Sequence, residues 1–161
     1  MASNTPIIKQ VAWVSLVPQI AFIIILIAVY NHFGFKDAGL FGALTYLSLS
    51  MSLRYFIPKN HREGIQLTKK NQFEKAISEY GKSYEYFTKN DWIDKYRFIT
   101  LLSSSKMNYR EMALCNIAFC YSQIGNGTKA IEFYQKTLEE FPENAIAESG
   151  LKMLNSTIDN Q

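Results

Sequence analysis

The chain has 161 residues, of which 48% are hydrophobic and 19% are charged, so it has room for one small domain and an additional segment. Its net charge of +3 arises within residues 1–60, which hold four basic residues and one acidic residue, because residues 61–161 hold 13 of each sign. Proteins that bind nucleic acid need Lys and Arg clustered on one face, so this balance argues against that class.

The first predicted element is an apolar segment over residues 11–31. No Lys, Arg, Asp or Glu lies between Lys9 and Lys36. A transmembrane helix requires about 20 apolar residues, which this segment supplies. A cleaved signal peptide is the alternative, but its hydrophobic region has about 7–15 residues and ends at a pair of small residues, which is missing here. The sequence therefore predicts a retained transmembrane helix.

A second apolar segment over residues 38–57 predicts another span, with Arg54 reaching toward the lipid headgroups. Small residues in a membrane helix permit close approach of a neighbouring helix. Those singled out for this packing role are Gly39, Gly42, Ala43 and Ser48. The alternative, that they are merely tolerated there, has equal weight. Because residues 31–37 form a short connection, residues 1–57 are predicted to be an N-terminal transmembrane hairpin.

Basic residues near the ends of the spans predict the orientation. Several follow the second span and Lys9 precedes the first, whereas the connection has only Lys36 beside Asp37. Such residues favour the cytoplasmic side, so both termini are expected in the cytoplasm, and the protein in a bacterial cytoplasmic (inner) membrane.

Cys115 and Cys120, five residues apart on one predicted helix, point in different directions and indicate no disulfide.

Residues 111–144 predict two antiparallel helices with a characteristic spacing. Large apolar residues fill the space between the helices, alanines let the backbones approach, and a proline ends the second helix. The residues at these positions are Leu114, Ile117, Ala118, Tyr121, Ala130, Tyr134 and Pro142. In this spacing the segment resembles a tetratricopeptide repeat (TPR), a 34-residue helix–turn–helix unit.

An earlier and weaker repeat is predicted over residues 57–90. Gly64, Ala76 and Tyr80 stand at the positions of Ala118, Ala130 and Tyr134, and Asn71-Gln72 marks the turn.

Two further helices complete the prediction. Between the repeats, apolar residues recur at helical spacing and predict an inserted helix over 92–102. Residues 145–155 predict an amphipathic helix that caps the array. The expected fold is thus all-α: a two-helix transmembrane hairpin followed by a cytoplasmic TPR-type α-solenoid over residues 58–158.

The resemblance implies protein binding. In TPR proteins the first helix of each pair lines a groove that holds an extended peptide or a helix. The positions that match here are His61, Ile65, Lys69, Met112, Cys115, Asn116, Phe119 and Gln123. Asn116 and Arg62 faintly resemble the clamp by which some TPR proteins bind a C-terminal carboxylate, but the accompanying basic residues are missing.

No set of residues predicts catalysis, a metal site or a cofactor, so the chain is interpreted as a non-enzyme. The preferred hypothesis is a membrane-tethered scaffold or adaptor. The alternative is an accessory or assembly subunit of a larger membrane complex, in which the hairpin makes the main contacts. An unrecognised enzyme is the third hypothesis. Repeat arrays need about three repeats for independent stability. Two alternatives follow: the two repeats suffice together with the inserted helix and the cap, or the array is supported by the membrane, by a second copy or by a partner.

Overall fold

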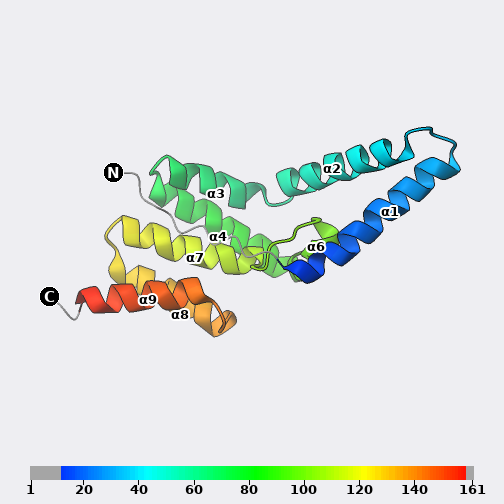
Figure 1. Cartoon of the computed structure of the whole chain (residues 1–161). Helices are drawn as coiled ribbons and strands as arrows, with labels where there is room; N and C mark the ends of the chain where they lie inside the picture. Colours follow the sequence, from blue (N-terminus) through cyan, green and yellow to red (C-terminus); the bar gives the residue numbers. More distant parts are fainter. Residues whose placement is uncertain (1–11, 159–161) are drawn as a thin grey trace. The chain divides into compact units, whose positions relative to one another are not determined.

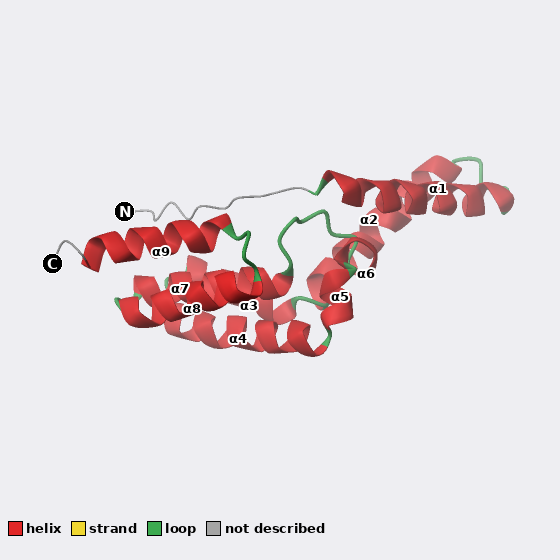
Figure 2. Ribbon diagram, turned by 90° about the horizontal axis from the view of Figure 1, so that it is seen from below, coloured by secondary structure: helices red, strands yellow, loops and turns green. Residues whose placement is uncertain are grey.

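The computed structural model describes residues 12–158, and its regular elements in that range are all helical, as the sequence predicts (Figure 2). Lys9 and Val11, which entered the predictions of orientation and of the first span, lie outside the described residues. After a short 3-10 helix, Trp13–Ser15, the elements are α1 (Leu16–His32), α2 (Ala38–Phe56), α3 (Lys59–Lys69), α4 (Phe73–Lys89), α5 (Asp91–Lys95), α6 (Arg97–Thr100), α7 (Tyr109–Gln123), α8 (Gly127–Glu140) and α9 (Ala145–Ile158) (Figure 1).

The chain divides into two compact units. The hairpin unit holds the residues up to Ile57 together with Lys95–Met107. The stack unit holds Pro58–Asp94 and the residues from Asn108 onward. The segment inserted between the two predicted repeats therefore groups mostly with the hairpin, although the sequence placed it in the C-terminal domain.

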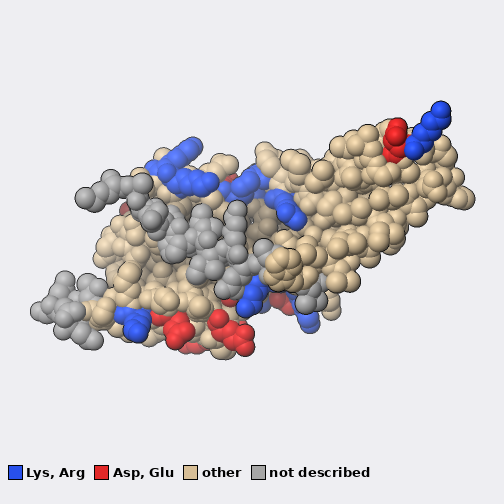
Figure 3. Space-filling model, viewed as in Figure 1, with Lys and Arg blue, Asp and Glu red and all other residues tan. Residues whose placement is uncertain are grey.

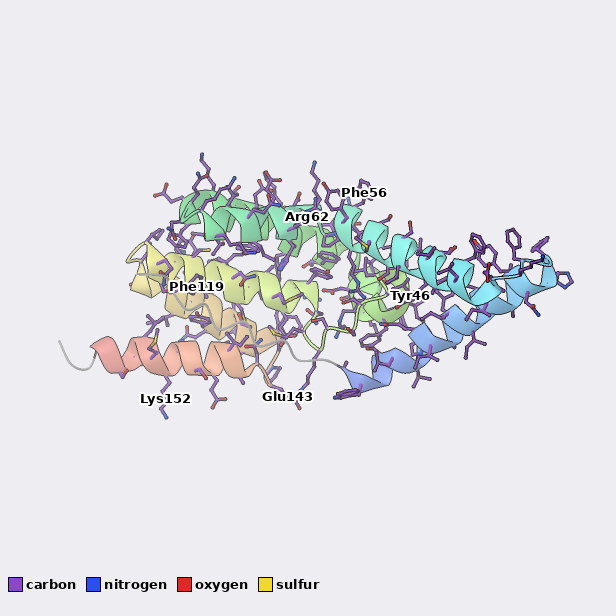
Figure 4. The ribbon with its side chains drawn as sticks, turned by 45° about the horizontal axis from the view of Figure 1, so that its top comes forward. Tyr46, Phe56, Arg62, Phe119, Glu143 and Lys152 are labelled. Carbon is purple, nitrogen blue, oxygen red and sulfur yellow. The ribbon has the colours of Figure 1, made fainter. Side chains whose placement is uncertain are left out.

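In the hairpin unit, α1 and α2 run back along each other (Figure 1). Gly42 lies at their closest approach, because a Cβ atom there would be 2.8 Å from Cγ1 and 3.1 Å from the backbone nitrogen of Ile27. Two side-chain hydrogen bonds also join the helices. Tyr30 pairs with Thr45 at 2.8 Å, and the Tyr46 hydroxyl donates to Oε1 of Gln19 at 3.1 Å (Figure 4).

The inserted segment differs from its prediction. In place of one helix over 92–102 there are two short helices, α5 and α6, which are separated at Tyr96. After α6, which packs against α1, the chain turns at Leu102, whose φ of 47° is in the left-handed region. Arg54 donates to the backbone carbonyls of Leu101 and Leu102. This side chain therefore binds protein, whereas the sequence predicted that it reaches lipid headgroups.

The lengths and hydropathy of the helices do not by themselves support two membrane spans. Within residues 12–158, no single helix meets a joint criterion of length and hydropathy for crossing a bilayer. Helix α1 is apolar but has only 17 residues, and α2 meets the criterion only when taken together with α3.

The stack unit is built from helices that pack in chain order. Helices α3, α4, α7, α8 and α9 each pack against the next, and α7 also contacts both α3 and α9. Contacts between sequential neighbours are the organising feature of helical-repeat folds. Four buried side chains from two helices form the core between the two helix pairs: Ala76 and Tyr80 of α4, and Ile117 and Cys120 of α7.

The turns within the two helix pairs have the same geometry. Asn71 and Gly125, which are 54 residues apart, both have positive φ, at 57° and 77°. The residue after each donates its N–H to a carbonyl five residues earlier, from Gln72 to Leu67 and from Asn126 to Tyr121, at 2.9 Å in both cases. The turns of the two helix pairs thus share their backbone conformation and their hydrogen-bond pattern.

Candidate functional site

The predicted groove residues lie on α3 and α7, which are in contact, but they differ in exposure. Six of the eight reach the surface at least in part. Ile65, Lys69 and Gln123 are exposed, and Met112, Asn116 and Phe119 are half-buried. The ring of Phe119, which is labelled in Figure 4, contacts that of Phe73 edge to face at a centroid distance of 6.4 Å. These six residues are hereafter called the α3–α7 surface.

His61 belongs to the core. Its side chain is 4% exposed and lies edge-on to the rings of Tyr80 and Tyr109, at centroid distances of 5.4 and 5.3 Å. The Nδ1 atom lies 3.4 Å from the hydroxyl of Ser83. Because burial disfavours the charged imidazolium, the pKa of His61 falls from 6.5 to about 4. A neutral, enclosed imidazole has no surface to offer a partner.

Cys115 is also enclosed, with its thiol 3.5 Å from Oδ1 of Asn144. Burial, reinforced by the charge of Glu111, raises the pKa of Cys115 to about 12, so the thiol stays protonated and is a poor nucleophile. Asn144 continues this polar network. It donates to Oε1 of Glu111 at 2.8 Å and accepts from the N–H of Ala147 in the first turn of α9 at 2.7 Å. Cys115 therefore helps to join α7 to α9.

Asp94, which no sequence pattern singled out, fixes the start of α7. Its buried carboxylate accepts the backbone N–H groups of Tyr109 at 2.7 Å and Arg110 at 2.9 Å. Asn108 and Glu111 form a reciprocal capping box at the same helix end. The spacing Asn-x-x-Glu is a recognisable sequence signal for such a cap. No local signal, in contrast, could identify Asp94, because its partners lie 15 and 16 residues later.

The small residues of α2 divide between two sides of the helix. Gly42 packs on α1, whereas a Cβ atom at Gly39 would meet nothing within 4 Å. Ser48 is exposed and Ala43 is half-buried. Ala38, which belongs to the same pattern of small residues in the sequence, is buried, and so is Ser50, which the sequence did not indicate as a packing residue. Gly42 is therefore the one selected residue at the close contact between α1 and α2.

The hairpin exposes apolar side chains on both of its helices. No charged residue lies between the connection of the hairpin and Arg54 near its base, and the face in view in Figure 3 has no blue or red side chains over this length. The large apolar and aromatic side chains exposed along the helices are Val17, Ile20, Ile24, Ile25 and Val29 of α1 and Leu40, Phe41, Leu44, Leu47, Leu49, Met51, Tyr55 and Phe56 of α2. Burying apolar surface of this extent against lipid or protein would be favourable.

Across residues 12–158, no cluster of three or more His, Cys, Asp or Glu side chains has the arrangement of a metal site. No protein-family model matches the chain, and no curated protein is significantly similar to it in sequence.

Proposed function

We propose that this protein is a membrane-tethered scaffold or adaptor. Its hairpin sits in a bilayer, and its TPR-like helical stack recruits another protein at the cytoplasmic face. The observation that carries the proposal is the set of exposed apolar side chains on both helices of the hairpin, which have no charged residue between their connection and Arg54. A helix that is apolar on all sides requires a non-aqueous environment, which a bilayer provides.

The dimensions of the hairpin are compatible with this environment. Helices α1 and α2 have 17 and 19 residues, within the range of about 17–25 residues for membrane-spanning helices. The pairing of Tyr30 with Thr45 and of Tyr46 with Gln19 gives polar side chains partners inside the hairpin. Interhelical hydrogen bonds of this kind stabilise helix pairs in lipid.

The proposed partner-binding site is the α3–α7 surface. Ile65 and Phe119 offer apolar area, while Lys69 and Gln123 offer a cation and hydrogen-bonding groups. An extended peptide or an amphipathic helix with an acidic flank has the matching chemistry. The repeated turn geometry and the sequential packing support an array of TPR type, in which this face would be the concave one.

The test replaces Ile65 and Phe119 by Asp in the tagged full-length protein. After cross-linking in membranes and detergent extraction, we expect the co-purifying protein to be lost, because two carboxylates would disrupt an apolar contact. Met153, which is exposed on α9 away from these residues in sequence, provides the matched control Met153→Asp. Far-UV circular dichroism checks that each variant keeps its helices. A partner that binds the folded double variant as tightly as the native protein would exclude the α3–α7 surface.

A second function, an accessory or assembly subunit of a larger membrane complex, is favoured by one observation. Gly39 has open space around it, so its side of α2 could receive another helix. Gly39→Leu tests this without disturbing the hairpin, whereas a side chain at Gly42 would collide with Ile27. A smaller native particle for Gly39→Leu favours the subunit function. An unchanged particle, together with partner loss in the Ile65/Phe119 variant, favours the adaptor.

A further inference from the structure

The segment Lys95–Met107 is attached to one end of the hairpin, the end that carries Arg54. Helix α6 packs against α1, and the Arg54 guanidinium donates to the carbonyls of Leu101 and Leu102. The backbone N–H of Ala12 donates to the carbonyl of Ser104 at 2.9 Å. These contacts hold the segment at the base of the hairpin, the end opposite to the connection between α1 and α2.

The segment is also internally ordered, because Arg97 fixes its fold. The buried guanidinium donates from Nε to the carbonyl of Ser105 at 3.1 Å and from Nη2 to that of Lys106 at 2.5 Å. The backbone carbonyl of Arg97 accepts the N–H of Ser103 at 3.1 Å. Leu101 is fully buried beneath this loop. The segment therefore presents a defined outer surface.

That outer surface has the chemistry of a membrane interface. Tyr96 and Ile99 are 53% and 65% exposed. Lys95 and Lys106 are exposed as well, and the residues from 95 to 107 include no Asp or Glu. Aromatic and apolar side chains flanked by cations bind where acyl chains meet anionic headgroups.

The ends of the hairpin helices at this base continue the same chemistry. Trp13, just before α1, and Tyr55 and Phe56, at the end of α2, have more than half of their surface exposed. Trp and Tyr concentrate at the boundary between the hydrocarbon core and water. The exposed residues of the inserted segment thus extend an aromatic band that the hairpin itself begins.

From these observations we infer that Lys95–Met107 is a third membrane-contacting element, which lies in the headgroup layer of an anionic bilayer beside the hairpin. Tyr96 and Ile99 insert among the upper acyl carbons, and Lys95 and Lys106 bind lipid phosphates. This inference rests on the proposed membrane anchor. It adds that, along the sequence, the chain returns to the bilayer after the first helix pair of the stack unit and before the second.

The experiment uses the full-length protein in vesicles that contain phosphatidylglycerol. The chain has two tryptophans, so Trp13→Phe with Trp92→Phe leaves none, and single reporters can be introduced. Ile99→Trp reports on the inserted segment, Ile24→Trp on the middle of α1, and Thr128→Trp on a site near the start of α8. Quenching is compared between lipids brominated near the headgroup and lipids brominated near the end of the acyl chain.

We expect the fluorescence of Ile99→Trp to be quenched mainly by headgroup-proximal bromine and that of Ile24→Trp mainly by chain-terminal bromine. Thr128→Trp should be unquenched by both. If Ile99→Trp behaves like Thr128→Trp while Ile24→Trp is quenched, the anchor stands and the inference is overturned. If Ile24→Trp is also unquenched, the anchor itself fails.

A second measurement tests the role of charge. In the Ile99→Trp background, Lys95→Gln with Lys106→Gln should weaken quenching in anionic vesicles, because each substitution removes a cation that is attracted to the negatively charged surface. The native lysines should likewise give weaker quenching in vesicles of phosphatidylcholine alone. Equal quenching in both lipids, with and without the lysines, would overturn the assignment of these side chains to lipid phosphates.

Discussion

The ring of Tyr80 packs directly on the backbone of Gly64, since a Cβ atom at Gly64 would lie 2.7 Å from Cε1 of Tyr80. The equivalent tyrosine of the second helix pair, Tyr134, has the same relationship with Gly150 of α9, at 2.6 Å from its Cζ atom. Each tyrosine thus needs a glycine opposite its ring. The first finds it within its own helix pair, and the second finds it in the helix that follows.

Gly64→Ala is expected to destabilise the stack unit by about 1–3 kcal/mol, the usual range for overpacking a filled core. The control is Gly81→Ala on α4, where an added Cβ atom meets nothing within 4 Å. Relief of the glycine entropy in a helix interior should stabilise that variant by roughly 0.5–1 kcal/mol. Thermal unfolding of the detergent-solubilised protein, followed by circular dichroism, measures both. If Gly64→Ala unfolded at the same midpoint temperature as the native protein, the ring of Tyr80 would have to move aside at little cost.

The turn residues should respond in opposite directions to substitution. Gly125 has φ +77° in open space, so Gly125→Ala introduces backbone strain without a steric clash and should cost about 1 kcal/mol. Asn71, with φ 57°, is already in the left-handed region, which Asn tolerates and Gly adopts without strain. Asn71→Gly should therefore leave the free energy of unfolding unchanged or raise it slightly. Denaturant unfolding of the two variants tests the pair. A Gly125→Ala variant of native stability would contradict the left-handed turn.

Stability should fall on mild acidification because of His61. Its pKa is 6.5 in the unfolded chain and about 4 in the fold, so the unfolded state binds the proton first as the pH drops. The neutral His61 side chain therefore contributes roughly 3 kcal/mol to the free energy of unfolding. This contribution is complete above pH 6.5 and is lost as the pH falls from 6.5 to about 4. His61→Phe should flatten this part of the stability–pH curve even if it lowers stability overall. His32→Gln, at an exposed position in the hairpin, is the control.

Removing the carboxylate of Asp94 should weaken the start of α7. Asp94→Ala leaves the N–H groups of Tyr109 and Arg110 without these acceptors, and loss of such a cap costs about 0.5–2 kcal/mol. Asp91→Ala is the matched control. Asp91 is largely exposed and pairs with the Arg110 side chain at 3.1 Å, a type of contact worth about 0–1 kcal/mol. Hydrogen exchange of the first turn of α7 should accelerate in the Asp94 variant alone.

Local sequence signals were sufficient for most of the helices. The predicted capping helix over 145–155 corresponds to α9, and the spans predicted over 11–31 and 38–57 correspond to α1 and α2 in position. Periodicity and turn residues act within a few positions of each other, so they define helices well. The inserted helix was predicted too long because Asp94 binds α7 and Leu102 is turned by contacts with Arg54. Those partners are distant in sequence.

The candidate site was harder to predict for the same reason. A position within a repeat indicates which face of a helix a residue occupies, but it does not indicate what covers that face. Tyr109 lies against His61, and Asn144 lies against Cys115. Tyr109 comes from another helix, α7, and Asn144 from the connection just before α9, so only the three-dimensional structure brings them into contact with His61 and Cys115.

The return of Lys95–Met107 to the hairpin unit means that the polypeptide passes between the two units three times, after Ile57, after Asp94 and after Met107. A shortened protein that begins at Pro58 would therefore still contain a piece that belongs to the missing part, with Leu101 and Leu102 deprived of the Arg54 guanidinium. Likewise, a single proteolytic cut just after α2 would not separate the stack unit from the hairpin unit, because Lys95–Met107 belongs to the hairpin unit and is joined covalently to the stack unit at both of its ends. Expression of those helices alone calls for replacing the insertion by a short linker, rather than for a simple N-terminal deletion.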